Sequence, residues 1–428
     1  MIKNSASLLP LLLLASFSFP NCTLAGDAIP LIDNWRFTSF GTLGFAHTQG
    51  DDLLAQHDLT QPQTFVNDNS WKLDSLIGAQ VSADLTKTVS ATVQGVVKSR
   101  LEPSLNHSIE RAFVGWQATP TLSFHGGRLR QDFYMLADYR DAGFAYLWMR
   151  PPIEFYGPVL LNSLDGVDAV YNHPLDGGVL SLRVVAGHSK PNLRTNVAEV
   201  ATLEFKDIYG LSVGYESDQW RLKAGAARLT FAANTDAIQR LADALSNPAV
   251  QTVWPGAQNY ADRVTLPGKT IGFYSAGASY ENLWQLSGEI GYITSDWDPL
   301  PDTLSAYLSV GRHIGTVTPY VLLARIRPTQ DTSAFTAPQT IPIPAINAQL
   351  TSLYDGLNGS MHLWRFDQHT VSVGARWDVY TNLALKLQWD HSEINADSGG
   401  LWQREPFASN LAPAATVDLF SASLNWMY

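Results

Sequence analysis

The feature that most constrains this chain is a two-residue alternation of apolar and polar side chains, repeated over segments of about ten residues. In 88–100 (TVSATVQGVVKSR), polar and basic residues hold most even positions, whereas valine, alanine and glycine hold most odd positions. The same period recurs in 370–378 and 383–392. Because successive side chains of a β-strand point to opposite faces, each segment predicts a strand with one apolar and one polar face. Strands of this kind cross a bilayer when they are about 9–11 residues long.

Strand candidates run along almost the whole chain, and their connections alternate between short and long. Short turns such as 118–119 and 217–218 are interleaved with long loops such as 232–268. Short turns on one side, long loops on the other and an even number of strands are typical of outer-membrane barrels. We therefore predict an all-β fold, a transmembrane antiparallel β-barrel with sixteen strands. The predicted strands are 35–47, 70–84, 88–100, 107–117, 120–130, 164–173, 178–188, 203–216, 219–231, 269–281, 283–296, 303–314, 316–328, 366–378, 380–393 and 415–428.

Residues 1–25 have the pattern of a secretory signal peptide, with a lysine, an apolar run over 8–19 and a small-x-alanine cleavage pattern. The pattern predicts export, with 26–428 as a single barrel domain. The one cysteine, Cys22, lies within the predicted signal. After it, no apolar run reaches the ~18 residues of a membrane-spanning helix, so the sequence excludes helical spans.

Composition narrows the possible functions. Charged residues make up only 16% of the chain, against about 25% in soluble domains, and the formal net charge is −11. No basic stripe is present, which excludes a nucleic-acid partner. The ten histidines are scattered, and neither a His-Glu-x-x-His metal motif nor a phosphate-binding loop occurs. The sequence therefore predicts no enzyme, no metal site and no cofactor.

The last predicted strand ends the chain with an aromatic residue. Phe420, Leu424, Trp426 and Tyr428 share one face of this strand. An aromatic C-terminus on an alternating strand resembles the assembly signal of bacterial outer-membrane proteins. The expected location is therefore the outer membrane of a Gram-negative bacterium, in contact with its lipid.

Two of the long loops carry further signals. Residues 234–246 predict a short amphipathic helix, capped by Asn234 or Thr235 and packed on the barrel rim. The loop 329–365 contains several prolines, which favour an irregular external loop.

The connection after the fifth predicted strand, 131–163, is the most informative for function. It is rich in tyrosine, phenylalanine and tryptophan and contains the pair Pro151-Pro152. Burying such groups contributes about 25 cal/mol per Å² of apolar surface, so this loop is expected to pack against another surface. In a barrel of this size the available surface is the lumen wall. We therefore expect the loop to fold inward and to narrow the channel.

These features resemble the general diffusion porins of Gram-negative bacteria. The resemblance rests on Gly127-Arg128 at the end of the fifth strand, the long third external loop, and Leu164–Tyr171 (LDGVDAVY) at the start of the return strand. It implies passive diffusion of small hydrophilic solutes and ions, a constriction formed by the third loop, and a homotrimer. The porins' loop usually carries an acidic cluster, whereas this one mixes acids with arginines. The candidate constriction residues are Asp132, Asp138, Arg140, Asp141, Tyr146, Trp148, Arg150 and Glu154.

Basic residues of the wall are expected to face this loop. Strand alternation predicts that a set of lysines and arginines points into the lumen, where they and the loop carboxylates would create a transverse field. The predicted wall residues are Lys98, Arg100, Arg111, Arg183, Arg325, Arg327 and Arg376.

Two other functions fit the same pattern. A substrate-specific channel for a sugar, an organic acid or an anion would use loop aromatics such as Tyr139, Tyr146 and Trp148. A barrel hydrolase would need a serine and a histidine on the lipid-facing surface, and Ser212 in the Gly-x-Ser-x-Gly stretch 210–214 is its one candidate. That motif requires a strand-to-helix turn, whereas here it lies within an alternating strand.

Overall fold

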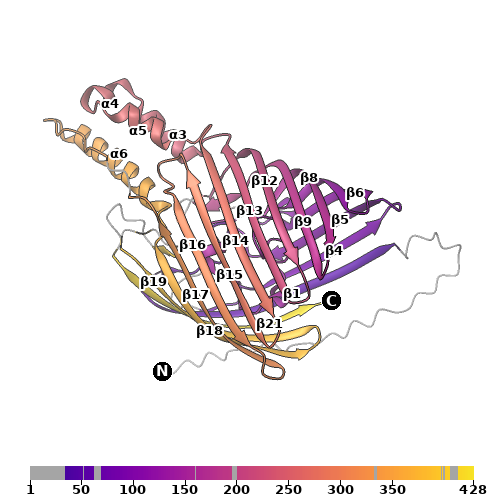
Figure 1. Ribbon diagram of the computed structural model, residues 1–428. Coiled ribbons are helices and arrows are strands. Elements are labelled where there is room, and N and C mark those ends of the chain that lie inside the picture. The colour runs from indigo at the N-terminus through magenta and orange to yellow at the C-terminus, as the bar shows by residue number, and fades with distance from the viewer. Residues whose placement is uncertain are drawn as a thin grey trace, which may run out of the picture.

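The computed structural model shows one barrel with a helical projection at one end (Figure 1). The predicted signal peptide, 1–25, lies outside the described residues. Among the helices within the described ranges, none is both long enough and apolar enough to cross a membrane. The structure describes residues 34–51, 53–61, 69–159, 161–194, 200–331, 335–396, 398, 401–404 and 413–428.

Sixteen long antiparallel strands, all within these ranges, form the closed barrel. All sixteen predicted strands are confirmed; the largest difference is at β4, which begins at Leu76 rather than at residue 70. The strands are β1 (Trp35–Gly50), β4 (Leu76–Asp84), β5 (Val89–Lys98), β6 (Ile109–Thr119), β7 (Leu122–Arg130), β8 (Ser163–Leu175), β9 (Gly178–Ser189), β12 (Phe205–Glu216), β13 (Trp220–Phe231), β14 (Thr270–Glu281), β15 (Trp284–Ser295), β16 (Thr303–Arg312), β17 (Val317–Pro328), β18 (Gln368–Tyr380), β19 (Leu383–Ile394) and β21 (Ala415–Met427).

The first and last strands close the ring. β1 pairs with β21 in a continuous register from Phe40–Met427 to Gly50–Val417. Ser39 and Tyr428 exchange two backbone hydrogen bonds of 2.7 Å each at the end of this ladder. Closure pairs the two strands that would otherwise be open edges of the sheet.

Short turns join the strands at one end of the barrel and long connections join them at the other. The long connections carry short elements of their own. These are β2 (Leu53–Leu54), β3 (Asn69–Ser70), α1 (Leu105–Ser108), the 3-10 turn η1 (Gly143–Ala145), α2 (Ile153–Tyr156), β10 (Asn192–Arg194), β11 (Val200–Thr202) and β20 (Gln403–Arg404).

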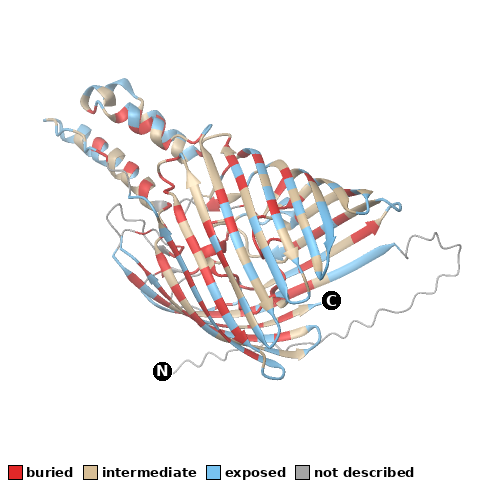
Figure 2. Ribbon diagram, viewed as in Figure 1, coloured by how far each residue is buried: buried red, intermediate tan, exposed pale blue. Residues whose placement is uncertain are grey.

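The two faces of the wall differ as the sequence alternation predicts. Figure 2 shows buried and exposed residues alternating along the strands. On β19, Lys386, Gln388 and Asp390 are buried on the inner face, whereas Leu385 and Leu387 are exposed on the outer face. The wall therefore has a largely apolar outer face and, over much of its area, a polar inner face.

β17 is an exception to this rule and corrects one prediction. Arg325 and Arg327 lie on the exposed outer face, in line with Leu323, and not on the inner face. The inner positions of β17 carry Leu322 and Ile326, which are buried in the apolar cluster that includes the third loop. The prediction assumed that polar residues face inward, and that assumption fails where a loop covers the wall.

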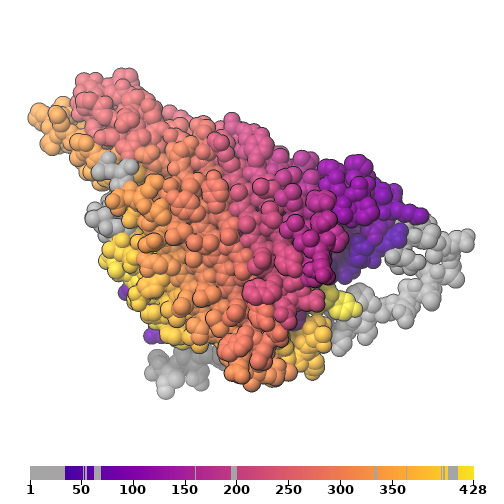
Figure 3. All heavy atoms as spheres, viewed as in Figure 1, coloured from indigo at the N-terminus to yellow at the C-terminus, as the bar shows by residue number. Residues whose placement is uncertain are grey.

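The helical projection is made of two long loops. α3 (Asp236–Leu245), α4 (Pro248–Val253) and α5 (Ala257–Val264) lie between β13 and β14, and α6 (Pro344–Leu363) lies between β17 and β18. Their buried apolar residues form one cluster. In Figure 3 the projection stands out from the body of the barrel.

The projection confirms one expectation and corrects another. The helix expected at 234–246 is present as α3, and Thr235 caps it by accepting a hydrogen bond from the Ile238 backbone. Ile238 contacts the apolar cluster of the barrel, whereas Ala242 and Leu245 pack in the helical projection rather than on the rim. The expectation of an irregular loop at 329–365 is wrong, because this segment contains α6. The helix begins at Pro344, and proline is compatible with the first helical turn.

Gly127 allows β6 and β7 to approach closely. Its φ angle is +133°, a value that residues with a side chain rarely adopt. A Cβ at this position would clash with the carbonyl oxygen of Ala112 and would lie 2.9 Å from Cα of Phe113. Gly126, its neighbour, has normal backbone geometry, and a Cβ there would meet only Val167, at 3.8 Å.

We expect Gly127→Ala to destabilise the folded barrel by about 1–3 kcal/mol, the usual cost of such backbone strain. Gly126→Ala is the matched control and should leave stability nearly unchanged. The measurement is the temperature at which the barrel loses its compact, fast-migrating form on a denaturing gel. Equal midpoints for the two variants would show that the backbone at Gly127 relaxes without cost.

Candidate functional site

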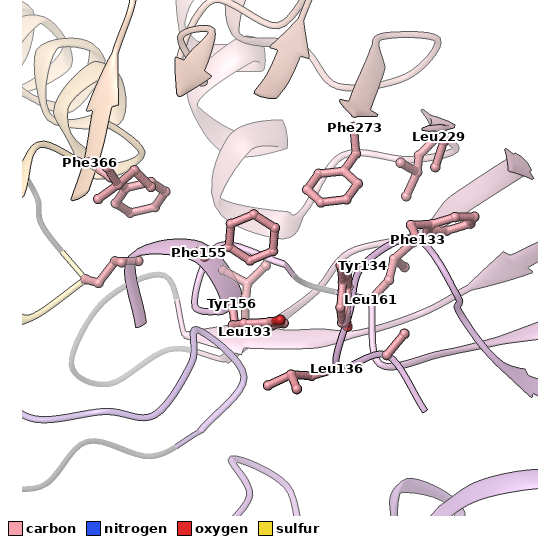
Figure 4. Close-up of a cluster of buried hydrophobic side chains, with 14 of the residues drawn as sticks. Phe133, Tyr134, Leu136, Phe155, Tyr156, Leu161, Leu193, Leu229, Phe273 and Phe366 are labelled. Carbon is pink, nitrogen blue, oxygen red and sulfur yellow. The ribbon is translucent and has the colours of Figure 1, made fainter. Parts of the chain in front are cut away.

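The connection between β7 and β8, residues 131–162 and hereafter loop 3, contacts the inner face of the wall at widely separated strands. The Phe133 carbonyl accepts a hydrogen bond from Ser275 on β14. The Trp148 indole N–H donates to Ser309 Oγ on β16 at 2.6 Å. The apolar side chains of loop 3 belong to a buried cluster that also includes residues of the wall (Figure 4).

Lys386 of β19 holds the middle of loop 3. Its ammonium group donates to the backbone carbonyls of Gly143, Tyr146 and Trp148 at 2.5, 2.6 and 2.6 Å. The nitrogen also lies 4.6 Å from the centre of the Tyr146 ring, within cation–π range. The side chain is almost fully buried, so these contacts replace its hydration shell.

Arg150 forms a second attachment through ion pairs. Its guanidinium makes a bidentate contact with Asp74, at 2.9 and 2.7 Å, and donates to Asp390 on β19 at 2.7 Å. It also donates to Ser421 on β21. All of these groups are buried, where a charge is stable only when it is paired and hydrogen-bonded.

Two buried glutamates form a third attachment. Glu154 in α2 accepts hydrogen bonds from Gln368, at 2.8 Å, and from Thr370 on β18. Glu289 on β15 accepts from the backbone N–H of Met135 at 2.8 Å and from the hydroxyl of Tyr156. Both ends of loop 3 are therefore fastened to the wall.

On the opposite wall, loop 3 meets a compact cluster of charges. Asp141 accepts a hydrogen bond from Lys98 at 2.7 Å and also pairs with Arg130. Glu110 on β6 pairs with Arg100 at 2.6 Å and lies 3.9 Å from the Lys98 ammonium. The five side chains are at most 12% exposed. We call this group the charge cluster.

Further ion pairs extend from the charge cluster toward the short-turn end. Arg111 donates to Asp138 at 3.0 Å. Arg183 pairs with Asp168 at 2.5 Å and lies 3.9 Å from Asp132, which also pairs with Lys223. Acids of loop 3 are thus matched by bases of the wall.

Two polar cavities flank the charge cluster. One, of about 220 Å³, opens among the long connections and is lined by Arg100 and Glu110. The other, of about 700 Å³, is lined by Arg111, Arg130 and Asp138. Because the carboxylate of Glu110 lies 3.8 Å from the guanidinium of Arg130, the charge cluster lies between the two cavities.

The remaining predicted residues have the following positions. Arg376 donates to the carbonyls of Phe144 and Tyr146 at 2.7 and 3.1 Å. Arg140 pairs with Asp58 of the first long connection at 3.1 Å, and its carbonyl accepts from the Tyr146 hydroxyl at 3.3 Å. Arg325 and Arg327 do not join the site, because they lie on the outer face.

Burial and ion pairing shift the acidity of groups in the long connections. The pKa of Asp141 lies well below its ordinary value. Burial alone would raise this pKa, but the positive charges of Lys98 and Arg130 outweigh the effect of burial. Burial raises the pKa of Glu154 above its ordinary value, because only neutral groups donate to it. Burial lowers the pKa of His57, in the first long connection, to about 4.

The structure does not support Ser212 as the nucleophile that a barrel hydrolase would need. Ser212 is 4% exposed on the inner face of β12, and its hydroxyl donates to Asp132 at 3.2 Å rather than to a histidine. Ser212 therefore does not occupy the lipid-facing position that a barrel hydrolase would need. In the part of the chain that the structure describes, no three or more His, Cys, Asp or Glu side chains are grouped to hold a metal ion.

Several residues of the site were not predicted from the sequence, namely Asp74, Glu110, Arg130, Glu289 and Lys386. Lys386 and Glu289 carry a usable signal, since each alternates with apolar neighbours and so falls on the inner face. Asp74 lies before the start of β4, although the predicted strand 70–84 included it, and its pairing with loop 3 has no signal in the sequence.

No protein-family model matches this chain, and no curated protein sequence matches it. Solved structures do match the barrel. The outer-membrane channel DcaP of Acinetobacter baumannii matches with a TM-score of 0.51 and 8% identity, over 93% of this chain and 98% of that chain. The anion-selective porin from Comamonas acidovorans matches with 0.50 and 14%, over 92% and 100%. Salmonella typhi OmpF in complex with daunomycin matches with 0.50 and 11%, over 92% and 98%.

These likenesses define the class of the fold, a closed sixteen-stranded antiparallel barrel. More narrowly, the fold is similar to that of the outer-membrane porins and channels that it matches. The resemblance to porins that the sequence indicated is confirmed at the level of the fold.

We expect Lys386→Met to release the middle of loop 3. The change keeps an unbranched side chain, one atom shorter, but leaves three backbone carbonyls without their donor, at about 1–3 kcal/mol each. Cleavage by trypsin after Arg140 should then accelerate about tenfold or more. The control is Lys206→Met, which removes an exposed lysine from β12. Unchanged cleavage in Lys386→Met would show that the other contacts suffice to hold the loop.

The packing around His57 should weaken as the pH falls from about 6.5 to 4. The unfolded chain binds a proton near pH 6.5, whereas the packed histidine resists protonation until about pH 4. Stability present above pH 6.5 is therefore lost over this window, by up to about 3 kcal/mol. Thermal unfolding at pH 7.5 and 4.5 measures the loss. His57→Leu should reduce it, and His173→Leu, at an exposed site on β8, should not.

Proposed function

We propose that this chain is an outer-membrane porin, a passive aqueous channel for small hydrophilic solutes and ions. Its signal peptide, 1–25, directs export, and the barrel then lies in the outer membrane with its apolar outer face against lipid. Loop 3 folds into the barrel and forms the constriction. The observation that carries this proposal is the charge cluster, where loop 3 and the wall meet between two polar cavities.

The pathway runs along the wall formed by β5, β6 and β7. A solute enters the cavity beside Arg100 and Glu110, passes the charge cluster, and leaves through the cavity beside Arg111 and Asp138. Paired charges in a narrow, poorly solvated passage create a strong transverse field. Such a field orders water and sorts solutes by charge and dipole.

The charge cluster also sets the width of this passage. Lys98 and Arg130 both bind Asp141, and these contacts bring loop 3 against the wall. The passage widens when the cluster separates, so conductance depends on both the charges and their attachment. A homotrimer is part of the proposal and rests on the resemblance to porins.

We expect the double variant Lys98→Ala, Arg100→Ala to make the channel more cation-selective. Loss of the two basic side chains leaves Asp141 and Glu110 with less compensating positive charge, which favours cations in the passage. The measurement is the reversal potential of purified protein in a planar bilayer under a salt gradient, and we expect a shift of roughly 10 mV or more toward the cation equilibrium potential.

The matched control is the double variant Arg325→Ala, Arg327→Ala, which removes the same net charge from the outer face. Its reversal potential should equal that of the unmodified protein. Equal shifts in both double variants would mean that net charge, rather than position, sets selectivity. Reproducible absence of conductance from folded barrels would contradict the pore itself.

A further inference from the structure

One sector of the inner wall is apolar, although a pore for ions and water needs a polar surface. At the long-loop end, β12–β15 turn phenylalanine, leucine and isoleucine side chains inward. Phe205, Leu229 and Phe273 are each at most 8% exposed. Part of this surface packs against loop 3, as Figure 4 shows for Phe133, Leu229 and Phe273.

Loop 3 does not fill the space beside this sector. A cavity of about 70 Å³ remains, bounded by loop 3, the inner wall and the segment before β18. Gln131 is the one amide side chain in its lining, and its Nε2 is engaged with the Tyr134 hydroxyl at 2.8 Å. Among the described residues, no ionisable side chain lines it. Its lining includes Phe133, Leu161, Ala227, Leu229, Phe273 and Phe366.

The size and chemistry of this cavity point to an apolar occupant. Protein interiors are close-packed, with few voids larger than a water molecule. A water needs two to four polar partners and occupies about 30 Å³ in the liquid, whereas apolar cavities stay dry and take up xenon or hydrocarbons. A cavity of about 70 Å³ has room for a short branched alkyl group and is small for an aromatic ring.

The cavity borders the polar pathway. Phe133 lines the apolar cavity, while the flanking residues Asp132 and Met135 line the larger polar cavity. The backbone carbonyl of Phe133 is held by Ser275 on the wall. A solute with a polar head and a short apolar tail would find a suitable surface in each of the two neighbouring cavities.

We propose that this cavity, which we call the apolar subsite, binds the short branched alkyl group of a small amphipathic solute. The proposal rests on the proposed function, because it names a class of solute for the channel. Binding itself requires no conduction, so the two proposals fail separately.

The first test uses xenon gas on crystals of the full barrel. We expect xenon to occupy the apolar subsite of the unmodified protein. Ala227→Leu projects three more carbons into the subsite and should abolish the xenon signal. Ala226→Leu adds the same atoms to the outer face of the same strand and should retain it. An empty subsite in the unmodified protein, or equal xenon occupancy in Ala227→Leu, would overturn the proposal.

The second test compares two alcohols in solution by tryptophan emission, since Trp364 lines the subsite. Each additional buried carbon strengthens binding about fourfold, so 2-methylpropan-1-ol, with two more carbons, should bind about fifteenfold more tightly than ethanol. Ala227→Leu should remove this difference. If that variant does not fold, Leu161→Phe fills the subsite from loop 3 without altering the wall. Equal binding of the two alcohols, or a preference that survives the filled subsite, would contradict an alkyl-binding role.

Discussion

Closure of the backbone hydrogen-bond ladder is the constraint on which the rest of this structure depends. A sheet exposed to lipid has no water to satisfy its peptide groups, so every strand needs a partner on both sides. The pairing of β1 with β21 provides the last of these ladders. Closure in turn fixes the two faces of every strand, because an alternating sequence then presents one set of side chains to the surroundings and the other to the interior.

Loop 3, which packs against the inner face of the wall, meets a second requirement. Its charged groups leave bulk water, and buried charges are stable only with partners. Asp141, Arg140 and Arg150 each find an opposite charge, on the wall or on the first long connection. The mixture of acids and arginines in loop 3, unlike the acidic cluster usual in porins, therefore fits a wall that itself carries both signs.

Much of the fold was predictable from the sequence because one physical rule, the alternation of side chains, governs all sixteen strands. Side chains alternate on β17 as well, but the assumption that polar residues face the interior failed at Arg325 and Arg327, where apolar packing rather than water covers the inner face. The composition of loop 3 indicated the functional region, but not the partners of its charges. Those partners, such as Asp74 and Lys386, are distant in the sequence, and only the closed ring brings them to the loop. Helix α6 was missed because its prolines suggested irregular structure, although Pro344 occupies a position that tolerates proline.

The attachment of loop 3 through Lys386 has a consequence for how such a channel can diversify. The three acceptors are backbone carbonyls, which every amino acid supplies. Substitution of Ala145, the exposed residue of 143–148, can therefore change the chemistry of the loop while its anchorage to β19 persists. The position of the loop and its exposed side-chain chemistry are in this way set by different atoms, so that one can change without rebuilding the other.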